Sequence, residues 1–199
     1  MTAKFSDDFL AKVRVFLNRY KSIEELNEFL EETTGMMDFF ESPYELKAFK
    51  QFLKGTHIFN GKTRDLGDFQ TPSHLTDKIC KYLVDMEFAP DAVLEPTCGE
   101  GNFVISAIEL FPSLKYIYCV DVQGKYEWLL KSNVLKLSSK QDINAKIEFH
   151  RDNIFTHRIS DRFTKFLAGN VQNLLILGNP PWVTSSELSI LSSDNLPPK

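Results

Sequence analysis

The chain has 199 residues, of which 43% are hydrophobic and 25% charged, and its 23 Lys and Arg against 27 Asp and Glu give a formal net charge of −4. This composition is ordinary for a globular protein and excludes collagen-like, coiled-coil and wholly disordered chains. The negative charge also excludes a protein that grips nucleic acid by its overall charge alone, so a phosphate-binding surface would be local or would lie on another chain.

No feature of the sequence predicts export or membrane insertion. Aliphatic runs such as 174–177 are far shorter than the roughly 20 apolar residues of a membrane-spanning helix. Residues 1–4 lead into an amphipathic stretch with charges throughout, which is unlike a signal peptide. The cysteines Cys80, Cys98 and Cys119 are widely spaced and form no Cys-x-x-Cys pair, so the sequence predicts neither a disulfide framework nor a zinc site. We expect a reducing, cytoplasmic environment.

Apolar side chains at helical spacing predict three helices near the start of the chain. The first follows Ser6, which suits an N-cap. The second begins at the capping box 22–25 and ends at Gly35, and the third begins at the capping box 42–45. We therefore expect a helical N-terminal region over residues 1–60.

A fourth helix is predicted after the Phe-Gln-Thr-Pro segment 69–72. Thr71 suits the N-cap and Pro72 the first helical position. The helix carries four apolar residues on one face, which predicts that this face is buried. They are Leu75, Ile79, Leu83 and Met86.

From here on, short apolar strands alternate with helices. Because this alternation is typical of βαβ units, it predicts a doubly wound α/β fold with a parallel sheet. The last strand is continuously apolar, as expected where helices cover both faces of a sheet. The predicted strands are 92–95, 116–120, 147–149 and 174–177.

The clearest chemical signal is the string 176–182, Ile-Leu-Gly-Asn-Pro-Pro-Trp, in which a buried strand runs into a rigid polar corner. The carboxyl end of a parallel strand is where open α/β sheets bind ligands. The side-chain oxygen of Asn179 and the carbonyl of Pro180 can accept two hydrogen bonds from one amino group. Trp182 offers a flat face on which a base can stack.

A second signal is the glycine loop within 94–103, where a strand is followed by Gly99, Gly101 and a helix. Such a loop lets the backbone approach a nucleotide-like ligand closely. A dinucleotide fingerprint requires a third glycine where Val104 stands. Glu95 would repel a pyrophosphate and attract a cationic amino or sulfonium group, which favours S-adenosylmethionine over NAD.

Acidic residues follow the next two strands. Asp121 lies at the end of the second strand, where an acid can accept both ribose hydroxyls of a nucleotide. Asp152 and Asn153 close the third strand, where a carboxylate can accept a hydrogen bond from an adenine amino group. Phe69, ahead of the fourth helix, suits packing on the same ligand.

In this order the features resemble the amino-methyltransferases that modify DNA bases, in particular the N6-adenine enzymes of the gamma arrangement. The resemblance covers about residues 65–185. It implies methyl transfer from S-adenosylmethionine to a flipped adenine of double-stranded DNA, as part of a restriction–modification system. It implies that four corner residues hold the adenine for catalysis: Asn179, Pro180, Pro181 and Trp182. It implies cofactor contacts by Phe69, Thr71, Pro72, Glu95, Thr97, Cys98, Gly99, Gly101, Phe103, Asp121, Asp152 and Asn153.

The resemblance also predicts an incomplete enzyme. The family's sheet has seven strands, whereas this sequence supplies about four of them. We expect an incomplete Rossmann-like methyltransferase core over 61–185, an unstructured tail over 186–199, and the strand 174–177 as an exposed sheet edge. A C-terminal target-recognition domain or a companion chain would complete it, and the isolated chain is expected to be a poor enzyme.

Other functions fit part of the pattern. Enzymes that methylate RNA adenine or a protein glutamine also use an Asn-Pro-Pro-aromatic corner, although Trp182 and the segment 69–72 favour DNA adenine. Cytosine N4 enzymes more often carry Asp or Ser at the position of Asn179. A fragment that binds S-adenosylmethionine without turnover is a third alternative. The four histidines have no ligand spacing, so no metal site is predicted.

Overall fold

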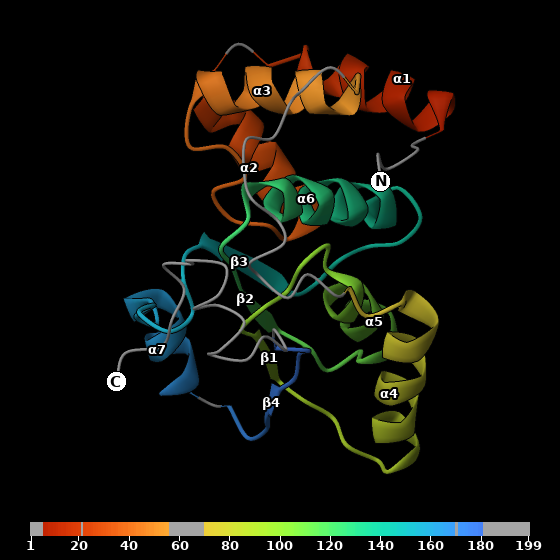
Figure 1. The fold of residues 1–199 in the computed structure, drawn as a ribbon, viewed down its shortest axis with the longest axis vertical. Helices are drawn as coiled ribbons and strands as arrows, with labels where there is room; N and C mark the ends of the chain where they lie inside the picture. Colours follow the sequence, from red (N-terminus) through yellow and green to blue (C-terminus); the bar gives the residue numbers. More distant parts are fainter. Residues whose placement is uncertain (1–5, 21, 56–69, 170, 181–199) are drawn as a thin grey trace, which may run out of the picture.

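The computed structural model describes residues 6–20, 22–55, 70–169 and 171–180, which form a parallel sheet between layers of helices (Figure 1). No helix in these ranges is long and apolar enough to cross a membrane. The elements in chain order are α1 (Asp7–Leu17), α2 (Ile23–Thr34), α3 (Pro43–Leu53), α4 (Ser73–Asp85), β1 (Ala92–Glu95), α5 (Asn102–Leu110), β2 (Tyr116–Asp121), α6 (Gly124–Ser138), β3 (Lys146–Arg151), α7 (Asp161–Leu167) and β4 (Leu174–Ile176).

The four strands are parallel and lie in the order β3-β2-β1-β4. Ala92 of β1 lies opposite Tyr116 of β2 on one side and Leu174 of β4 on the other. The chain therefore builds outward from β1 to β3 and then crosses back, so that the topological switch lies between β1 and β4. This arrangement confirms the predicted α/β class with a Rossmann-like parallel sheet, and its switch is where such sheets bind ligands.

Helices cover both faces of the sheet. Figure 1 shows α4, α5 and α6 along one side and α7 on the other. Every position of β2 is buried, which explains its continuously apolar sequence. On the α7 side, the ring of Phe163 lies 4.6 Å from that of Tyr118 and 5.2 Å from that of Tyr116. The strands are thus held between two apolar layers, and their polar groups emerge at the carboxyl edge.

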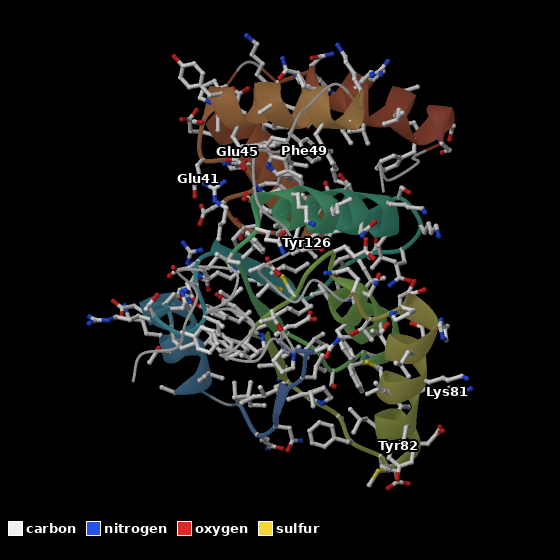
Figure 2. The ribbon with its side chains drawn as sticks, viewed as in Figure 1. Glu41, Glu45, Phe49, Lys81, Tyr82 and Tyr126 are labelled. Carbon is white, nitrogen blue, oxygen red and sulfur yellow. The ribbon has the colours of Figure 1, made fainter. Side chains whose placement is uncertain are left out.

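The N-terminal helices pack on α6. The rings of Phe49 and Phe52 from α3 meet Trp128 of α6 edge-on, with centroids 6.3 and 5.6 Å apart, and Figure 2 shows Phe49 between these helices. The buried residues of α1, α2 and α3 belong to the same apolar cluster as those of the sheet and of α5 and α6. The first helices therefore share one core with the sheet.

The segment between α2 and α3 also extends the sheet. The N–H of Met37 donates to the carbonyl of Ile147 at 2.9 Å, and the N–H of Ile147 donates to the carbonyl of Gly35 at 2.8 Å. These bonds occupy the outer edge of β3, which would otherwise present free backbone groups. The N-terminal region thus protects one edge of the sheet.

A buried lysine joins α3 to α6. Lys131 is 3% exposed, and its Nζ lies 2.7 Å from Glu45 Oε1 and 2.6 Å from Glu127 Oε1. Figure 2 shows Glu45 on the side of α3 that faces α6. The ammonium group also lies 5.4 Å from the ring centroid of Phe39 and 5.5 Å from that of Phe40. The buried ammonium group therefore pairs with two carboxylates and lies over two aromatic rings. Such pairing is what allows a charge to be buried.

The predicted caps of α2 and α3 are confirmed. Ser22 and Ser42 each accept a hydrogen bond from the backbone N–H three residues further on, at 3.1 and 3.3 Å, and Ser160 caps α7 in the same way at 3.1 Å. Gly35 ends α2 in the left-handed conformation, with φ of 71°. These short-range signals act within one turn of helix, which is why the sequence alone reveals them.

The predicted start of α4 is wrong by one residue. Pro72 is the N-cap and Ser73 the first helical residue, without a side-chain cap. Thr71 stays outside the helix because its carbonyl accepts a hydrogen bond from the side-chain amide of Asn102 at 2.8 Å. A tertiary contact thus overrides the local capping preference.

The predicted buried face of α4 is also wrong. The helix buries Thr76 and Cys80 against α5, where the Thr76 hydroxyl lies 2.7 Å from the hydroxyl of Ser106. The predicted apolar stripe lies beside this face, and three of its four residues are exposed, with Leu83 half-buried. The exposed fractions are 43% for Leu75, 38% for Ile79 and 61% for Met86.

Candidate functional site

The loops after β1 and β4 touch at the carboxyl edge of the sheet. The N–H of Leu177 donates to the carbonyl of Leu94 at 3.1 Å, which continues the pairing of the two strands beyond β4. Further on, Thr97 Oγ1 donates to the carbonyl of Asn179 at 3.3 Å. The corner and the glycine loop, 82 residues apart in sequence, are therefore in direct contact.

The start of the Asn-Pro-Pro-Trp corner is the part that the structure describes. A Cβ built on Gly178 would lie 3.4 Å from Pro96 Cδ, so the backbone passes close to the loop after β1. Asn179 is half-buried and Pro180 is exposed. Pro181 and Trp182 lie outside the described residues.

The glycine turn has a conformation that other residues rarely adopt. Gly99 and Gly101 have φ of 53° and 83°. A Cβ on Gly101 would lie 2.2 Å from Leu130 Cδ1, and one on Gly99 would lie 2.1 Å from Gln70 Oε1. Both glycines are thus required by the backbone angle and by the space around them.

Glu95 is a buried carboxylate beside this turn. It is the last residue of β1 and is 2% exposed, and its Oε2 is a buried polar atom without a hydrogen-bond partner among the described residues. Burial raises its pKa well above the ordinary range, and the nearby Cys119 and Asp121 raise the pKa further. A buried carboxylate with an unused oxygen is suited to a cationic donor from outside the protein.

Asp121 holds the glycine turn from the end of β2. Its Oδ2 accepts the N–H of Gly99 and its Oδ1 accepts the N–H of Gln123, both at 2.8 Å. The N–H of Cys98 donates to the carbonyl of Val120 at 3.0 Å, which fixes the same loop to β2. The predicted ribose acid therefore lies against the glycine turn, where it also orders the loop.

The segment before α4 covers the other side of the turn. Gln70 Oε1 accepts the N–H of Glu100 at 3.0 Å, and Asn102 anchors Thr71 as described above. From α6, Asn133 Nδ2 donates to the carbonyl of Glu100 at 2.9 Å. The structure thus brings 70–72 to the loop, as the sequence predicts, while Phe69 lies outside the described residues.

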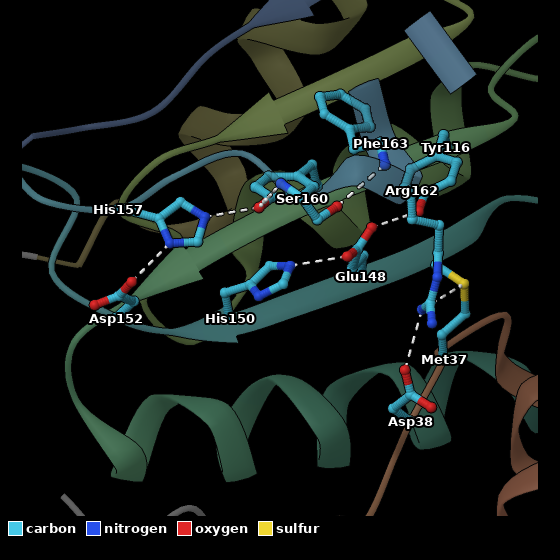
Figure 3. Close-up of polar contacts among 11 residues, drawn as sticks. Met37, Asp38, Tyr116, Glu148, His150, Asp152, His157, Ser160, Arg162 and Phe163 are labelled. Carbon is cyan, nitrogen blue, oxygen red and sulfur yellow. Dashed lines mark hydrogen bonds and ion pairs between the residues drawn. The ribbon is translucent and has the colours of Figure 1, made fainter. Parts of the chain in front are cut away.

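Asp152 stands next to Asp121 at the same edge. Its N–H donates to the carbonyl of Asp121 at 3.1 Å, and its Oδ1 accepts the N–H of Asn153 at 2.7 Å. Its Oδ2 lies 2.8 Å from His157 Nδ1 (Figure 3). The hydrogen bond from His157, followed by that from Asn153, lowers the pKa of Asp152, so its carboxylate is ionised at neutral pH.

Two predicted cofactor contacts point into the protein instead. Cys98 and Phe103 are 3% and 6% exposed and belong to the apolar core under the loop. Burial raises the pKa of the Cys98 thiol, which keeps it protonated and unreactive. These residues support the turn from below rather than offering polar groups to a ligand.

Sequence reasoning misses three residues of this edge. Gln70 and Asn102 fix the segment before α4 to the glycine turn, and His157 bonds to the carboxylate of Asp152. Gln70 lies within the segment 69–72 and Asn102 within the stretch 94–103, so these motifs include both residues but do not show what their side chains bind, and no sequence signal marks His157. Their hydrogen-bond partners lie 5 to 31 residues away, which short-range spacing does not reveal.

The fold and site define an α/β protein with a glycine loop, a chain of acids and an asparagine–proline corner gathered at one topological switch. No group of three or more His, Cys, Asp or Glu in the described ranges could hold a metal ion. Methyltransferases with S-adenosylmethionine are one class that combines these features, which agrees with the resemblance seen in the sequence.

A comparison with curated proteins gives a specific relative. The chain is 34% identical over 136 residues to the Type II methyltransferase M.NspV of Nostoc sp. (strain ATCC 29411 / PCC 7524). The match covers 68% of this chain and 26% of that protein, so the chain spans about a quarter of the relative's length. The chain is thus related to part of a type II methyltransferase, which confirms the resemblance at this level.

A comparison with solved structures gives two matches with low TM-scores. A crystal structure assigned as the modification subunit of a type I restriction enzyme from Vibrio vulnificus YJ016 matches 83% of this chain and 30% of its own, with 18% identity and a TM-score of 0.41. Coclaurine N-methyltransferase, bound to N-methylheliamine and SAH, matches 85% of this chain and 48% of its own, with 16% identity and a TM-score of 0.38. A comparison with protein-family models found no match.

Proposed function

We propose that the chain is part of a DNA adenine methyltransferase that transfers a methyl group from S-adenosylmethionine to N6 of a flipped adenine within a restriction–modification system. The observation that carries this proposal is the contact between Thr97 of the glycine loop and Asn179 of the corner, beside the unpaired carboxylate of Glu95. Donor and acceptor sites must adjoin for a direct transfer, and these two loops do.

The cofactor side of the site fits S-adenosylmethionine. The unused oxygen of Glu95 suits the cationic end of this cofactor, and the left-handed glycine turn at the carboxyl edge of the sheet is a backbone conformation suited to a nucleoside. Asp121 would hold the ribose hydroxyls and Asp152 the adenine amino group. Thr71, Pro72 and Thr97 would line the site. When bound, the cofactor supplies an electrophilic methyl group on a sulfonium centre.

The substrate side is the asparagine–proline corner. The side-chain oxygen of Asn179 and the carbonyl of Pro180 would accept hydrogen bonds from the exocyclic amine, which draws its lone pair out of conjugation and toward the methyl group. Pro181 and Trp182 would complete this corner, with Trp182 stacking on the flipped base. Positioning and hydrogen bonding are the main catalytic effects, so no activated side-chain nucleophile is required.

Double-stranded DNA would be the substrate, and a further polypeptide segment would supply target recognition. Two surfaces support a docked segment. β4 pairs with β1 alone among the described strands, and its Leu174 and Ile176 are 37% and 63% exposed. Figure 1 shows α4 at the same end of the molecule as β4, and this part of the chain exposes Leu75, Ile79 and Met86. Apolar surface of this kind marks an interface.

A two-step experiment tests the proposal. Calorimetric titration with S-adenosylhomocysteine measures cofactor binding by the 199-residue chain, and transfer of a labelled methyl group is then measured on DNA, RNA and protein, with and without a polypeptide matching the rest of M.NspV. We expect binding by the chain alone and strong DNA transfer only with the added polypeptide. Absence of binding would contradict the proposal.

Matched variants sharpen that test. Asn179→Ala is expected to leave cofactor affinity within about twofold and to lower transfer by 100-fold or more, because only the acceptor amine loses its partner. Asn173→Ala, on the opposite end of β4, is the control and should leave both unchanged. Transfer to RNA or to a protein glutamine in place of DNA would favour those substrates, and binding without any transfer would indicate a non-catalytic module.

A further inference from the structure

A chain of hydrogen bonds leads from Asp152 into the protein. His157 Nδ1 lies 2.8 Å from Asp152 Oδ2, and His157 Nε2 lies 2.7 Å from the hydroxyl of Tyr118. That hydroxyl accepts the N–H of Ser160 at 3.1 Å. Figure 3 shows the imidazole between the carboxylate and the base of α7. The Tyr118 side chain is fully buried and that of His157 is 5% exposed, so both are fixed by their surroundings.

The partners of the imidazole define its protons. An ionised carboxylate can only accept, so Nδ1 of His157 must carry a hydrogen and donate it to Asp152. In the neutral ring Nε2 is then an acceptor, and the hydroxyl of Tyr118 donates to it while accepting from Ser160. Every donor and acceptor in this chain is satisfied with a neutral ring in the Nδ1–H tautomer.

Asp152 keeps capacity for further hydrogen-bond donors. A carboxylate has about four acceptor sites, and the two described bonds, from Asn153 and His157, use one on each oxygen. The Asp152 side chain is 50% exposed, so its outer side can reach a ligand. The inner bonds fix the plane of the carboxylate and therefore the direction in which the remaining sites point.

We propose that His157 is a positioning residue for the cofactor's adenine: it orients the carboxylate of Asp152 to accept the exocyclic amino group. This inference rests on the proposed function, which assigns the adenine to Asp152. A carboxylate that is already oriented loses less conformational freedom when the ligand binds. The oriented carboxylate also discriminates between ligands. A carbonyl group in place of the amino group has no hydrogen to donate to Asp152.

His150 provides a matched control. Its ring centroid lies 5.0 Å from that of His157, and both rings lie beside Tyr118. Its Nε2 bonds to Glu148 Oε1 at 2.9 Å, however, and not to Asp152. A change at His150 therefore perturbs the same cluster without touching the oriented carboxylate.

The test compares two ligands by calorimetry on the full chain: S-adenosylhomocysteine and S-inosylhomocysteine, which has a carbonyl in place of the amino group. We expect the wild type to prefer the amino ligand by roughly tenfold or more, as for a hydrogen bond to a charged group. His157→Gln cannot donate from the Nδ1 position and should lower this preference at least threefold. His157→Asn keeps a donor there and should retain it, as should His150→Gln.

Several results would overturn the inference. If His157→Gln lowers the affinity for both ligands equally, the substitution has affected only packing. If it lowers neither affinity, the hydrogen bond from His157 to Asp152 does not contribute to binding. A nitrogen-15 spectrum of the wild type that shows the Nε2–H tautomer of His157 would also overturn it, without any ligand. Equal binding of both ligands by the wild type removes the role of Asp152 and of His157 while leaving cofactor binding intact. Binding of neither ligand contradicts the proposed function itself.

Discussion

Two of the places where the described chain buries charged groups differ in how the charge is paired. Between α3 and α6, the ammonium of Lys131 meets the carboxylates of Glu45 and Glu127 within 2.7 Å. Under the glycine turn, Glu95 is as deeply buried but leaves Oε2 without a partner in the described chain. The first site is complete within the fold and joins the N-terminal helices to the sheet layer. The second leaves a buried oxygen unused, which is why we place the proposed cofactor site there.

The largest expected effect comes from breaking the complete site. Lys131→Met removes the ammonium group that pairs with the half-buried carboxylate of Glu45 and the buried carboxylate of Glu127, and we expect it to lower the free energy of unfolding by about 3 to 5 kcal/mol in a urea titration. Adding Glu45→Gln and Glu127→Gln to the same chain removes the stranded charges and should restore most of the loss. A single variant that loses less than about 1 kcal/mol would show that water already reaches this site.

The next effect concerns the backbone of the glycine turn. Gly101→Ala forces a left-handed residue and places its Cβ 2.2 Å from Leu130 Cδ1, so we expect a loss of about 2 to 4 kcal/mol. Gly55→Ala is the control, because its φ of 70° is similar but no atom lies within 4 Å of the built Cβ. It should cost about 1 kcal/mol. Equal losses in thermal unfolding would mean that the space over Leu130 does not matter.

At Glu95 we expect a substitution to stabilise the protein, which is opposite to the effect expected at Lys131. Glu95→Gln removes an acid that burial keeps from ionising at its ordinary pKa, and it should raise the free energy of unfolding at neutral pH by about 1 kcal/mol, while lowering the affinity for S-adenosylmethionine at least tenfold. Glu148→Gln is the matched control. Its carboxylate is also buried but bonds to Tyr116 and His150, so this change should destabilise the protein. If both variants behaved alike, the contrast between paired and unpaired carboxylates would fail.

The smallest effect is a change in the pH dependence of stability. The folded-state pKa of Glu95 lies above its ordinary value of 4.5. At pH values between these two pKa values, the folded state therefore binds more protons than the unfolded state. The contribution of Glu95 to stability therefore falls as the pH rises above about 4.5. The stability difference between Glu95→Gln and the wild type should be small at pH 4 and grow toward pH 8. A constant difference would place Glu95 in contact with solvent.

Local signals explain which parts of the fold the sequence could predict. The caps at Ser22, Ser42 and Ser160 act within one turn, and the strands β1, β2 and β4 are marked by unbroken apolar runs. β3 was predicted as 147–149 but extends over Lys146–Arg151, because its pairing with β2 includes polar residues at both ends. Strand pairing depends on the tertiary structure and produces no pattern of apolar residues that the sequence would reveal.

The candidate site divides in the same way. The order of glycine loop, acids and asparagine–proline corner could be read from spacing, because each follows a predicted strand. The contact between Thr97 and Asn179 needed the crossover that puts β4 beside β1. The anchoring of Thr71 by Asn102 moved the start of α4, and packing on α5 reversed the expected burial of its apolar stripe.

The sequence by itself determined the class of fold, most of the helix caps and the loops of the candidate site, because these depend on side-chain type and short spacing. Only the tertiary structure decided which carboxylates are satisfied and which one is not. That difference is set by distance across strands: Asp121 meets the glycine turn, Asp152 meets His157, and Glu95 is buried with one oxygen unused. Burial makes that unused oxygen costly, and this cost is the physical reason to expect a ligand there.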